Sequence, residues 1–278
     1  MTLGIGTLGF IGGGNMAEAI IRGILDTGLL KPEQLLVTDK SGERRDYLGK
    51  AFPIRLVTSN VEVLDKADVL MFAVKPQNMA DLMTELRDHV KRDVLFLSIL
   101  AGTRSATIEG GLASPKCPKP RVVRIMPNTP ALIGMGMAGL SRGANATDDD
   151  MHIAESIFRS VGRVITIDEH QMDAMTALSG SGPAYLFYVI ESLIEAGVEI
   201  GFSAEESEEI VLQMVSGSAE LARRAGKPVE ELRRQVTSPG GTTAAGIAVL
   251  EEREIRDDFI AAVVAAEQRG QQLGRLAK

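Results

Sequence analysis

The chain has 278 residues, of which 45% are hydrophobic, and carries a formal net charge of −7. Its one cysteine, Cys117, excludes an internal disulfide and a cysteine-ligated metal cluster, and its three histidines lack the i, i+4 spacing of a helical zinc site, so we expect no metal. The acidic balance argues against nucleic-acid binding, no apolar run reaches the roughly 20 residues of a membrane span, and the N-terminal segment lacks a signal peptide's basic region. We therefore predict a cytoplasmic protein that acts on small molecules, with no nucleic-acid or membrane partner.

The first 167 residues alternate between short apolar runs and amphipathic segments. Runs that predict strands lie at residues 5–11, 35–37, 69–74, 94–100 and 122–126, and helical patterns lie between them at 16–27, 43–51, 78–90 and 105–112. Continuously apolar strands separated by helices are typical of a parallel sheet covered on both faces. We therefore predict an open, doubly wound α/β sheet over residues 1–167.

From residue 168 onward the pattern is helical. Helices are predicted at residues 182–201, 203–225, 229–236, 242–253 and 255–276, and no strand is predicted among them. Ser203 and Glu206 have the spacing of a capping box at a helix start. Small residues line several of these helices, which fits a helical core and a dimer interface equally well. The sequence therefore predicts an all-helical domain over residues 168–278.

A glycine-rich turn, Gly12-Gly-Gly14-Asn-Met-Ala17, follows the first predicted strand and opens the first predicted helix. In this setting the first glycine permits the tight turn, the second lets a pyrophosphate approach the backbone, and the helix N-terminus attracts its charge. The alternative is a glycine-rich turn without a ligand, but its place at the start of a βαβ series favours a dinucleotide. Gly12, Gly14, Asn15 and Met16 are the candidates.

The end of the second predicted strand bears on the ribose of that dinucleotide. Asp39 stands where an acid binds the 2′-hydroxyl of NAD. Lys40, Ser41 and Arg44 follow closely and suit the 2′-phosphate of NADP instead, although charged turns are often only solvated surface. Asp39, Lys40 and Ser41 are therefore candidates, both NADPH and NADH stay open as cofactors, and the pattern leans slightly to NADP.

Two further loops are expected at the carboxyl edge of the sheet, where such folds bind ligands. One follows the run at 69–74 and contains a lysine, and the other, at 126–130, has an asparagine between two prolines. The alternative for each is a rigid turn that binds nothing. The cofactor candidates are Ala73, Val74, Lys75, Pro76 and Asn128 in these loops, together with Asn60, which lies before the run at 69–74.

Two clusters of glycine, serine, threonine and proline in the second half each precede a helix, at residues 179–185 and 237–243. Backbone amides, hydroxyls and a helix N-terminus together suit a carboxylate. Ordinary N-capping by Ser181 or Thr242 is the alternative, but it explains one hydroxyl and leaves the rest of the cluster unexplained. The substrate candidates are Ser181, Ser238, Gly240, Gly241, Thr242 and Thr243.

The motifs at residues 9–16, 73–76, 126–130, 179–185 and 238–243 together closely resemble those of pyrroline-5-carboxylate reductase, the enzyme of the last step of proline synthesis. The resemblance runs over essentially the whole chain. It implies an N-terminal Rossmann domain, a C-terminal all-helical dimerisation domain, and reduction of 1-pyrroline-5-carboxylate to L-proline with NADPH or NADH. It also implies that Thr243 hydrogen-bonds the substrate as the catalytic residue, with Ser238, Gly241 and Thr242 near the carboxylate, and that homodimers assemble further, commonly into decamers.

The nearest rival is a β-hydroxyacid dehydrogenase, which shares the two-domain plan. Those enzymes place a catalytic lysine in the first long helix of the second domain, whereas here no lysine lies between Lys119 and Lys227. Alcohol oxidation needs a base for the hydroxyl proton, whereas reduction of an imine does not. A nucleotide-sensing module without activity would keep the glycine-rich turn but has no use for a carboxylate loop.

Overall fold

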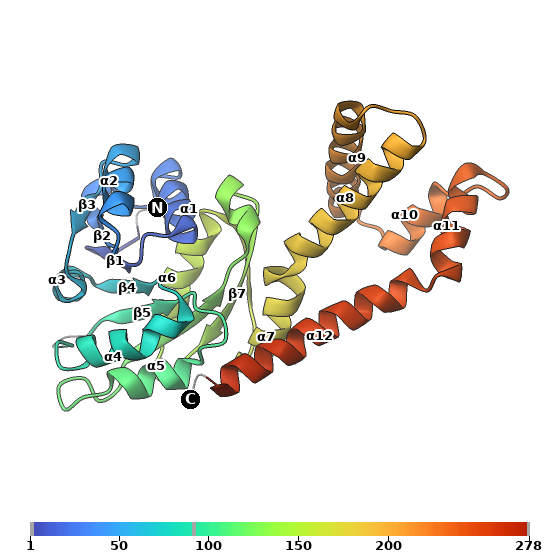
Figure 1. Ribbon diagram of the computed structural model, residues 1–278. Coiled ribbons are helices and arrows are strands. Elements are labelled where there is room, and N and C mark those ends of the chain that lie inside the picture. The colour runs from blue at the N-terminus through green and yellow to red at the C-terminus, as the bar shows by residue number, and fades with distance from the viewer. Residues whose placement is uncertain (1–2, 91–92, 277–278) are drawn as a thin grey trace. The chain divides into compact units, whose positions relative to one another are not determined.

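The computed structural model describes residues 3–90 and 93–276 (Figure 1). Residues 1–2, 91–92 and 277–278, which the predicted domain ranges include, lie outside the described residues. The chain forms two compact units: residues 1–181 together with 266–278 make the first unit, and residues 182–265 make the second. The domain boundary expected between residues 167 and 168 stays a prediction.

The first unit contains an eight-stranded sheet, counted over the described residues, with the order β3-β2-β1-β4-β5-β6-β7-β8. Strands β1 to β6 pair in parallel, β7 runs antiparallel to β6, and β8 is parallel to β7. The strands are β1 Leu8–Ile11, β2 Leu35–Thr38, β3 Arg55–Val57, β4 Val69–Phe72, β5 Leu95–Ser98, β6 Arg121–Met126, β7 Gly136–Arg142 and β8 Gly162–Thr166. The predicted doubly wound sheet is thus confirmed.

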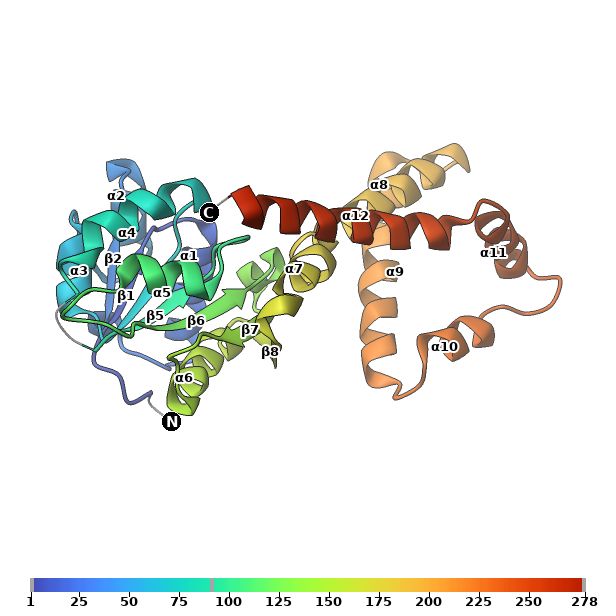
Figure 2. The ribbon, with the colours of Figure 1, turned by 90° about the horizontal axis from the view of Figure 1, so that it is seen from below.

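Helices cover both faces of the sheet because alternate residues of the central strands point to opposite sides. On one face Leu8 and Phe10 of β1 pack with α1 and α6, and on the other Ile11 packs with α3, α4 and α5. Figure 2 shows α4 and α5 on one side of the sheet and α6 on the other. The helices of this unit are α1 Asn15–Asp26, α2 Gly42–Ala51, α3 Asn60–Lys66, α4 Met79–Arg87, α5 Ser105–Leu112, α6 Asp148–Arg159 and α7 Met172–Met175.

The sequence pattern did not predict three strands and three helices of this unit: β3, β7, β8, α3, α6 and the short α7. These strands lack continuous apolar runs. The edge strand β3 has an exposed arginine and two half-buried residues, β7 contains two glycines, and β8 at the other edge is largely exposed. The edge strands β3 and β8 bury less surface, so their sequences carry a weaker apolar signal, whereas β7 is largely buried but its apolar run is interrupted by glycines.

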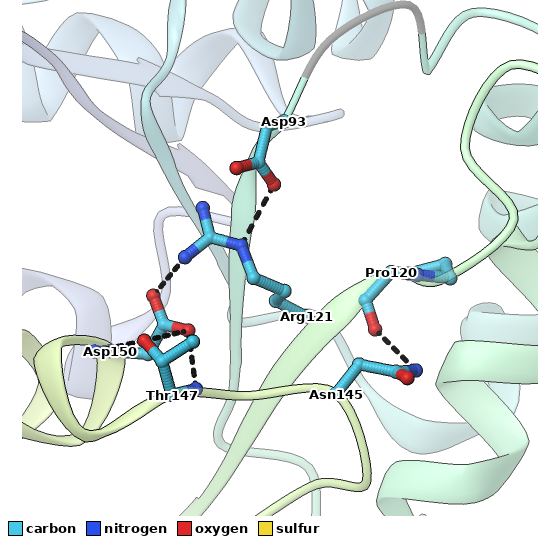
Figure 3. A network of polar contacts seen from close by, with 6 residues as sticks. All are labelled: Asp93, Pro120, Arg121, Asn145, Thr147 and Asp150. Atoms are coloured by element: carbon cyan, nitrogen blue, oxygen red, sulfur yellow. Dashed lines mark hydrogen bonds and ion pairs between the residues drawn. The ribbon is translucent and has the colours of Figure 1, made fainter.

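A polar network ties the amino ends of β5 and β6 to the start of α6 (Figure 3). Arg121 donates from Nε to Oδ1 of Asp93 at 2.8 Å and also binds Asp150, a residue that is only 1% exposed. The backbone N–H and the hydroxyl of Thr147 donate to Oδ2 of Asp150 at 2.8 and 2.9 Å. Burial lowers the pKa of Arg121, but its bonds to the two carboxylates outweigh that effect and raise the pKa.

The second unit is helical throughout, as predicted. It contains α8 Gly182–Glu199, α9 Ala204–Arg224, α10 Val229–Gln235, α11 Thr242–Glu252 and the first half of α12 Ile255–Leu276. The predicted capping box is present: the N–H of Glu206 donates to Ser203 Oγ at 3.2 Å, and the N–H of Ser203 donates to Glu206 Oε2 at 2.8 Å. No helix within the described residues combines the length and apolar character that a bilayer crossing requires.

Helices α8 and α9 approach closely where Gly197 faces Ser207, since a Cβ on Gly197 would lie 2.6 Å from Ser207 Oγ. The second half of α12, from Ala266, belongs to the first unit. There Gly274 lies against the turn after β5, because a Cβ on Gly274 would be 3.2 Å from the carbonyl oxygen of Gly102. Glycines thus mark the close contacts of both units.

Candidate functional site

The loops that carry most of the cofactor candidates meet at one edge of the sheet. Because β1, β2, β4 and β6 are mutually parallel in direction, the residues that follow each of them lie at the same carboxyl edge. Hydrogen bonds hold these loops in register: Gly12 N–H donates to the carbonyl of Thr38 at 2.9 Å, and Ala73 N–H donates to the carbonyl of Ile11 at 2.9 Å. The edge is therefore a framework that presents backbone and side chains from several loops together.

The glycine-rich turn after β1 fits a phosphate-bearing ligand. Gly12 has a φ of 99°, and a Cβ there would lie 2.5 Å from the carbonyl oxygen of Ala73. Gly14 is the N-cap of α1, and a Cβ on it would meet no atom within 4 Å. No side chain among the described residues caps α1. Open space before an uncapped helix start, at Asn15 and Met16, is what a pyrophosphate needs.

Asp39 follows β2 directly and points its carboxylate at this turn. Its Oδ2 accepts from the N–H of Gly13 at 2.8 Å, and its Oδ1 accepts from the N–H of Ser41 at 2.8 Å. The hydroxyl of Ser41 caps α2 by accepting from the N–H of Arg44 at 3.2 Å. Lys40, between them, is exposed. All three residues named from the sequence thus lie beside the glycine-rich turn.

Arg44 is joined to α1 by an ion pair that the sequence gave no reason to expect. Its Nη2 lies 2.6 Å from Oε2 of Glu18, and its Nε donates to the carbonyl of Gly13. Glu18 also accepts from the hydroxyl of Tyr47 and from Arg22, each at 3.1 Å. Burial raises the pKa of Glu18, but these three hydrogen bonds outweigh it and hold the pKa below the ordinary 4.5. Glu18 is therefore a carboxylate at neutral pH.

The loop after β4 carries Ala73, Val74, Lys75 and Pro76 to the same edge, with Lys75 exposed just before a short 3-10 turn. Asn60 lies at the start of α3, close after β3, but its amide is already in use. Its Nδ2 donates to Oε2 of Glu85 in α4 at 2.8 Å. The contact of Asn60 is thus with a neighbouring helix.

Asn128 joins two motifs that lie 51 residues apart in the chain. Its Nδ2 donates to Oγ of Ser179 at 3.1 Å, and its Oδ1 accepts from the N–H of Met137 at 2.8 Å. The sequence pointed to Asn128 but did not select Ser179, although Ser179 lies in the motif at 179–185. The structure thus joins the loop after β6 to the start of this motif within the first unit.

A π-helical turn, Thr176–Gly180, precedes Ser181. The N–H of Ser181 donates to the carbonyl of Thr176 at 2.8 Å, which completes the wide turn. Such single π-turns are frequent at functional sites. The hydroxyl of Tyr185, at the end of the same motif, is buried without a hydrogen-bond partner among the described residues. The motif therefore holds donors that this chain's described side chains do not use.

The loop at 238–243 lies in the second unit. Gly241 is the N-cap of α11, Thr242 and Thr243 are its first two residues, and no side chain in the described part of the chain caps this helix. Gly240 has a φ of 72°, and the N–H of Gly241 donates to the carbonyl of Ser238 at 3.0 Å. Ser238, Gly240, Thr242 and Thr243 are exposed. Capping by Thr242 is therefore not what this cluster does, and its exposed hydroxyls and the first amides of α11 suit a ligand.

Comparison with known proteins gives the family. Residues 169–273 match the family model described as pyrroline-5-carboxylate reductase dimerisation, and residues 7–102 match the model for NADP oxidoreductase, coenzyme F420-dependent. The curated pyrroline-5-carboxylate reductase of a Synechocystis species is 40% identical over 96% of this chain and 98% of its own length.

Solved structures give the same result. A pyrroline-5-carboxylate reductase from Coxiella burnetii matches with a TM-score of 0.89 and 37% identity, covering 96% of this chain and 98% of that one. A Plasmodium falciparum pyrroline carboxylate reductase with NADP bound matches with a TM-score of 0.87 and 33% identity, covering 99% and 100%. With identity above 30% along almost its entire length, this chain belongs to the pyrroline-5-carboxylate reductase family.

Proposed function

We propose that this protein reduces 1-pyrroline-5-carboxylate to L-proline with a hydride from NADPH or NADH, the last step of proline synthesis. The observation that carries the proposal is the 40% identity, over 96% of the chain, to a protein named for this activity. The local geometry supports it, because an open glycine-rich turn suits a dinucleotide and an uncapped helix start suits a carboxylate.

We assign the dinucleotide to the carboxyl edge of the sheet. There the amides at the start of α1, around Gly14, would hold the pyrophosphate, and Asp39 would face the adenosine ribose. Ala73, Lys75 and Asn128 present further backbone and side-chain groups along the same edge. When bound there, the reduced dinucleotide would supply a hydride for C5 of the imine, and the ring nitrogen would take its proton from solvent.

We assign the substrate carboxylate to the loop before α11. Ser238, Gly240, Gly241 and Thr242 combine exposed hydroxyls and amides at an uncapped helix start, which favours an anion. Thr243, the second residue of α11, would hydrogen-bond the ring nitrogen of the substrate as the catalytic residue. Ser181 would orient the nicotinamide ring. A protonated imine is already a strong electrophile, so the protein needs mainly to position it against the hydride donor. Such positioning can lower the activation barrier by up to roughly 7–11 kcal/mol.

The proposal includes a homodimer formed through the helical unit, with dimers assembling further into a decamer. The match of residues 169–273 to a dimerisation model supports the dimer. We also propose a cytoplasmic location, where reduced nicotinamide dinucleotides are renewed.

An absorbance assay at the reduced-nicotinamide band tests the function. The purified protein is mixed with NADH or NADPH in parallel, with and without pyrroline-5-carboxylate. We expect oxidation of the dinucleotide that depends on the imine, with proline formed in equal amount. Oxidation of the dinucleotide that does not depend on the imine, or no oxidation with either dinucleotide, would contradict the proposal.

A further inference from the structure

NADH and NADPH differ at one position, the 2′ carbon of the adenosine ribose, which bears a hydroxyl in one and a phosphate in the other. In doubly wound folds a carboxylate after the second strand accepts a hydrogen bond from the hydroxyl, and an arginine nearby accommodates the phosphate. This chain has both residue types at that place, Asp39 and Arg44. What each side chain already contacts therefore decides between the two ligands.

Asp39 is held in the orientation that a ribose hydroxyl requires. The N–H groups of Gly13 and Ser41 each donate to a different carboxylate oxygen, both at 2.8 Å, so the side chain cannot turn away without losing two hydrogen bonds. A carboxylate has about four acceptor positions on its two oxygens, which leaves capacity for further donors. A phosphate brought to the same place would instead meet a fixed negative charge.

Arg44 is held away from a phosphate by its own contacts. Glu18 Oε2 lies 2.6 Å from its Nη2, the carbonyl of Gly13 accepts from its Nε, and the ring centroid of Tyr47 lies 4.8 Å from its guanidinium carbon. The side chain of Glu18 is only 14% exposed. A 2′-phosphate would have to draw Arg44 away from its 2.6 Å contact with this largely buried carboxylate, which would then keep only the 3.1 Å contact with the more exposed Arg22 as an ion pair among the described residues, and losing the closer partner is costly.

Arg45 and Lys40, the other cations next to Asp39, are less suited to bind a 2′-phosphate. Arg45 donates to the backbone carbonyl of Asp39, so its guanidinium supports the turn. Lys40 is exposed and has no ion pair among the described residues. A single lysine on a flexible stem is a point charge without the two-pronged geometry that arginine offers a phosphate, and here the carboxylate of Asp39 is adjacent in the chain.

We propose that Asp39 and the Glu18–Arg44 ion pair together set the dinucleotide preference of this protein, in favour of NADH over NADPH. Asp39 binds the 2′-hydroxyl of NADH, and Glu18 holds Arg44 so that it does not bind the 2′-phosphate of NADPH. The inference rests on the proposed function, because it presumes that the glycine-rich turn binds a nicotinamide dinucleotide. It departs from the slight lean to NADP that the sequence alone suggested.

The test measures binding separately from turnover. Dissociation constants of NADH and NADPH are determined by nucleotide fluorescence on the full-length protein without the imine, and kcat/KM is then measured with each. We expect the wild type to bind NADH at least about tenfold more tightly than NADPH. Glu18→Gln keeps the size of the side chain and removes its charge, so NADPH should bind about tenfold more tightly than before, while NADH changes by less than about twofold.

Two further variants distinguish the effect of the ion pair on NADPH binding from the effect of removing any negative charge nearby. Glu43→Gln removes an exposed carboxylate in the first turn of α2 and should leave both dissociation constants near the wild-type values. In the double variant Glu18→Gln with Arg44→Gln, the gain for NADPH should disappear, because the freed guanidinium is the group that produces it. A gain in Glu43→Gln as large as that in Glu18→Gln would overturn the role of the ion pair.

The outcomes also distinguish preference from function. Equal or tighter binding of NADPH by the wild type, together with imine-dependent turnover, would overturn the NADH preference and leave the function standing. Binding of neither dinucleotide would overturn the function and the preference with it. Unchanged NADPH binding in Glu18→Gln would show that Glu18 does not restrain Arg44.

Discussion

Gly12 and Gly14 stand two positions apart in one turn, and only Gly12 is required by the fold itself. At Gly12 the backbone φ is 99° and a Cβ would lie 2.5 Å from the carbonyl oxygen of Ala73, so the fold itself needs glycine. At Gly14 the φ is −65° and a Cβ would meet no protein atom within 4 Å. The fold therefore tolerates a Cβ at Gly14, where the proposed pyrophosphate would approach the backbone.

Alanine at these two positions should give opposite results. Gly12→Ala should lower the free energy of unfolding by about 1–3 kcal/mol, because it forces a strained φ and displaces the loop after β4. Gly14→Ala should leave that free energy within about 0.5 kcal/mol of wild type but weaken binding of NADH and NADPH. Urea unfolding and nucleotide fluorescence measure the two effects. Full dinucleotide affinity in Gly14→Ala would remove the pyrophosphate from this turn.

Thr243 is the residue on which the proposed chemistry depends. Thr243→Ala should lower kcat/KM for the imine on the order of 10- to 100-fold, because a hydrogen bond to a charged group is lost, while the dissociation constant of the dinucleotide stays unchanged. Thr237→Ala is the matched control, since the Thr237 hydroxyl donates to the carbonyl of Arg233 at 2.6 Å and is not a predicted site residue. Wild-type turnover by Thr243→Ala would exclude it from the mechanism.

At the scale of elements, the carboxyl and amino ends of the strands carry different kinds of residues. The carboxyl edge carries the cofactor candidates, whereas the amino end of β6 carries the network of Arg121, Asp93 and Asp150 (Figure 3). Asp150 is 1% exposed and Thr147 supplies two further hydrogen bonds to it. This network joins β6 to α6 at the edge away from the ligand candidates, so it should matter for stability and not for catalysis.

Removing the arginine tests this division. Arg121→Ala leaves the buried Asp150 carboxylate without its cation and should lower the free energy of unfolding by about 3 kcal/mol, with kcat/KM preserved in folded protein. Arg142→Ala is the control, because its partner Asp148 is 93% exposed and such surface pairs contribute about 0–1 kcal/mol. Chemical denaturation compares the two. Equal losses would mean that burial of Asp150 does not set the strength of the pair.

Strands were predictable where the sequence has a continuous apolar run and not where it lacks one. The run at 94–100 became the fully buried β5, whereas β7, with Gly136 and Gly139 in it, has no continuous apolar run to recognise. The site followed the same logic. Gly12, Asp39 and Thr243 stand in local motifs, but Glu18 looks like any surface carboxylate of a helix. Its partner Arg44 is 26 residues away and meets it only when α2 packs beside the start of α1.

At the scale of the whole molecule, the second unit leaves large apolar side chains uncovered. Tyr188 of α8, Ile200 after it and Ile260 of α12 are 71%, 77% and 57% exposed. Val211 is the one hydrophobic residue of α9 that is buried within the described chain. Apolar surface of this extent marks a protein–protein interface, in agreement with the dimerisation model that residues 169–273 match.

A charge on this surface should therefore dissociate the dimer. Ile260→Asp places a carboxylate where an apolar contact is expected, and burial of an unpaired charge is strongly unfavourable, so the variant should sediment as a monomer at concentrations where wild type is dimeric. Asp258→Ala, two positions earlier in the same helix, should sediment like wild type. Sedimentation velocity across a dilution series measures the oligomeric state of both variants. An unaltered dimer in Ile260→Asp would place the interface elsewhere.

The return of α12 to the first unit makes the helical unit an insertion, since residues 182–265 leave and rejoin a unit that holds both chain ends. A tag, fluorophore or fusion protein attached at either terminus is thus carried by the sheet-bearing part. Expressing the helical unit alone would therefore require cutting the gene at two places.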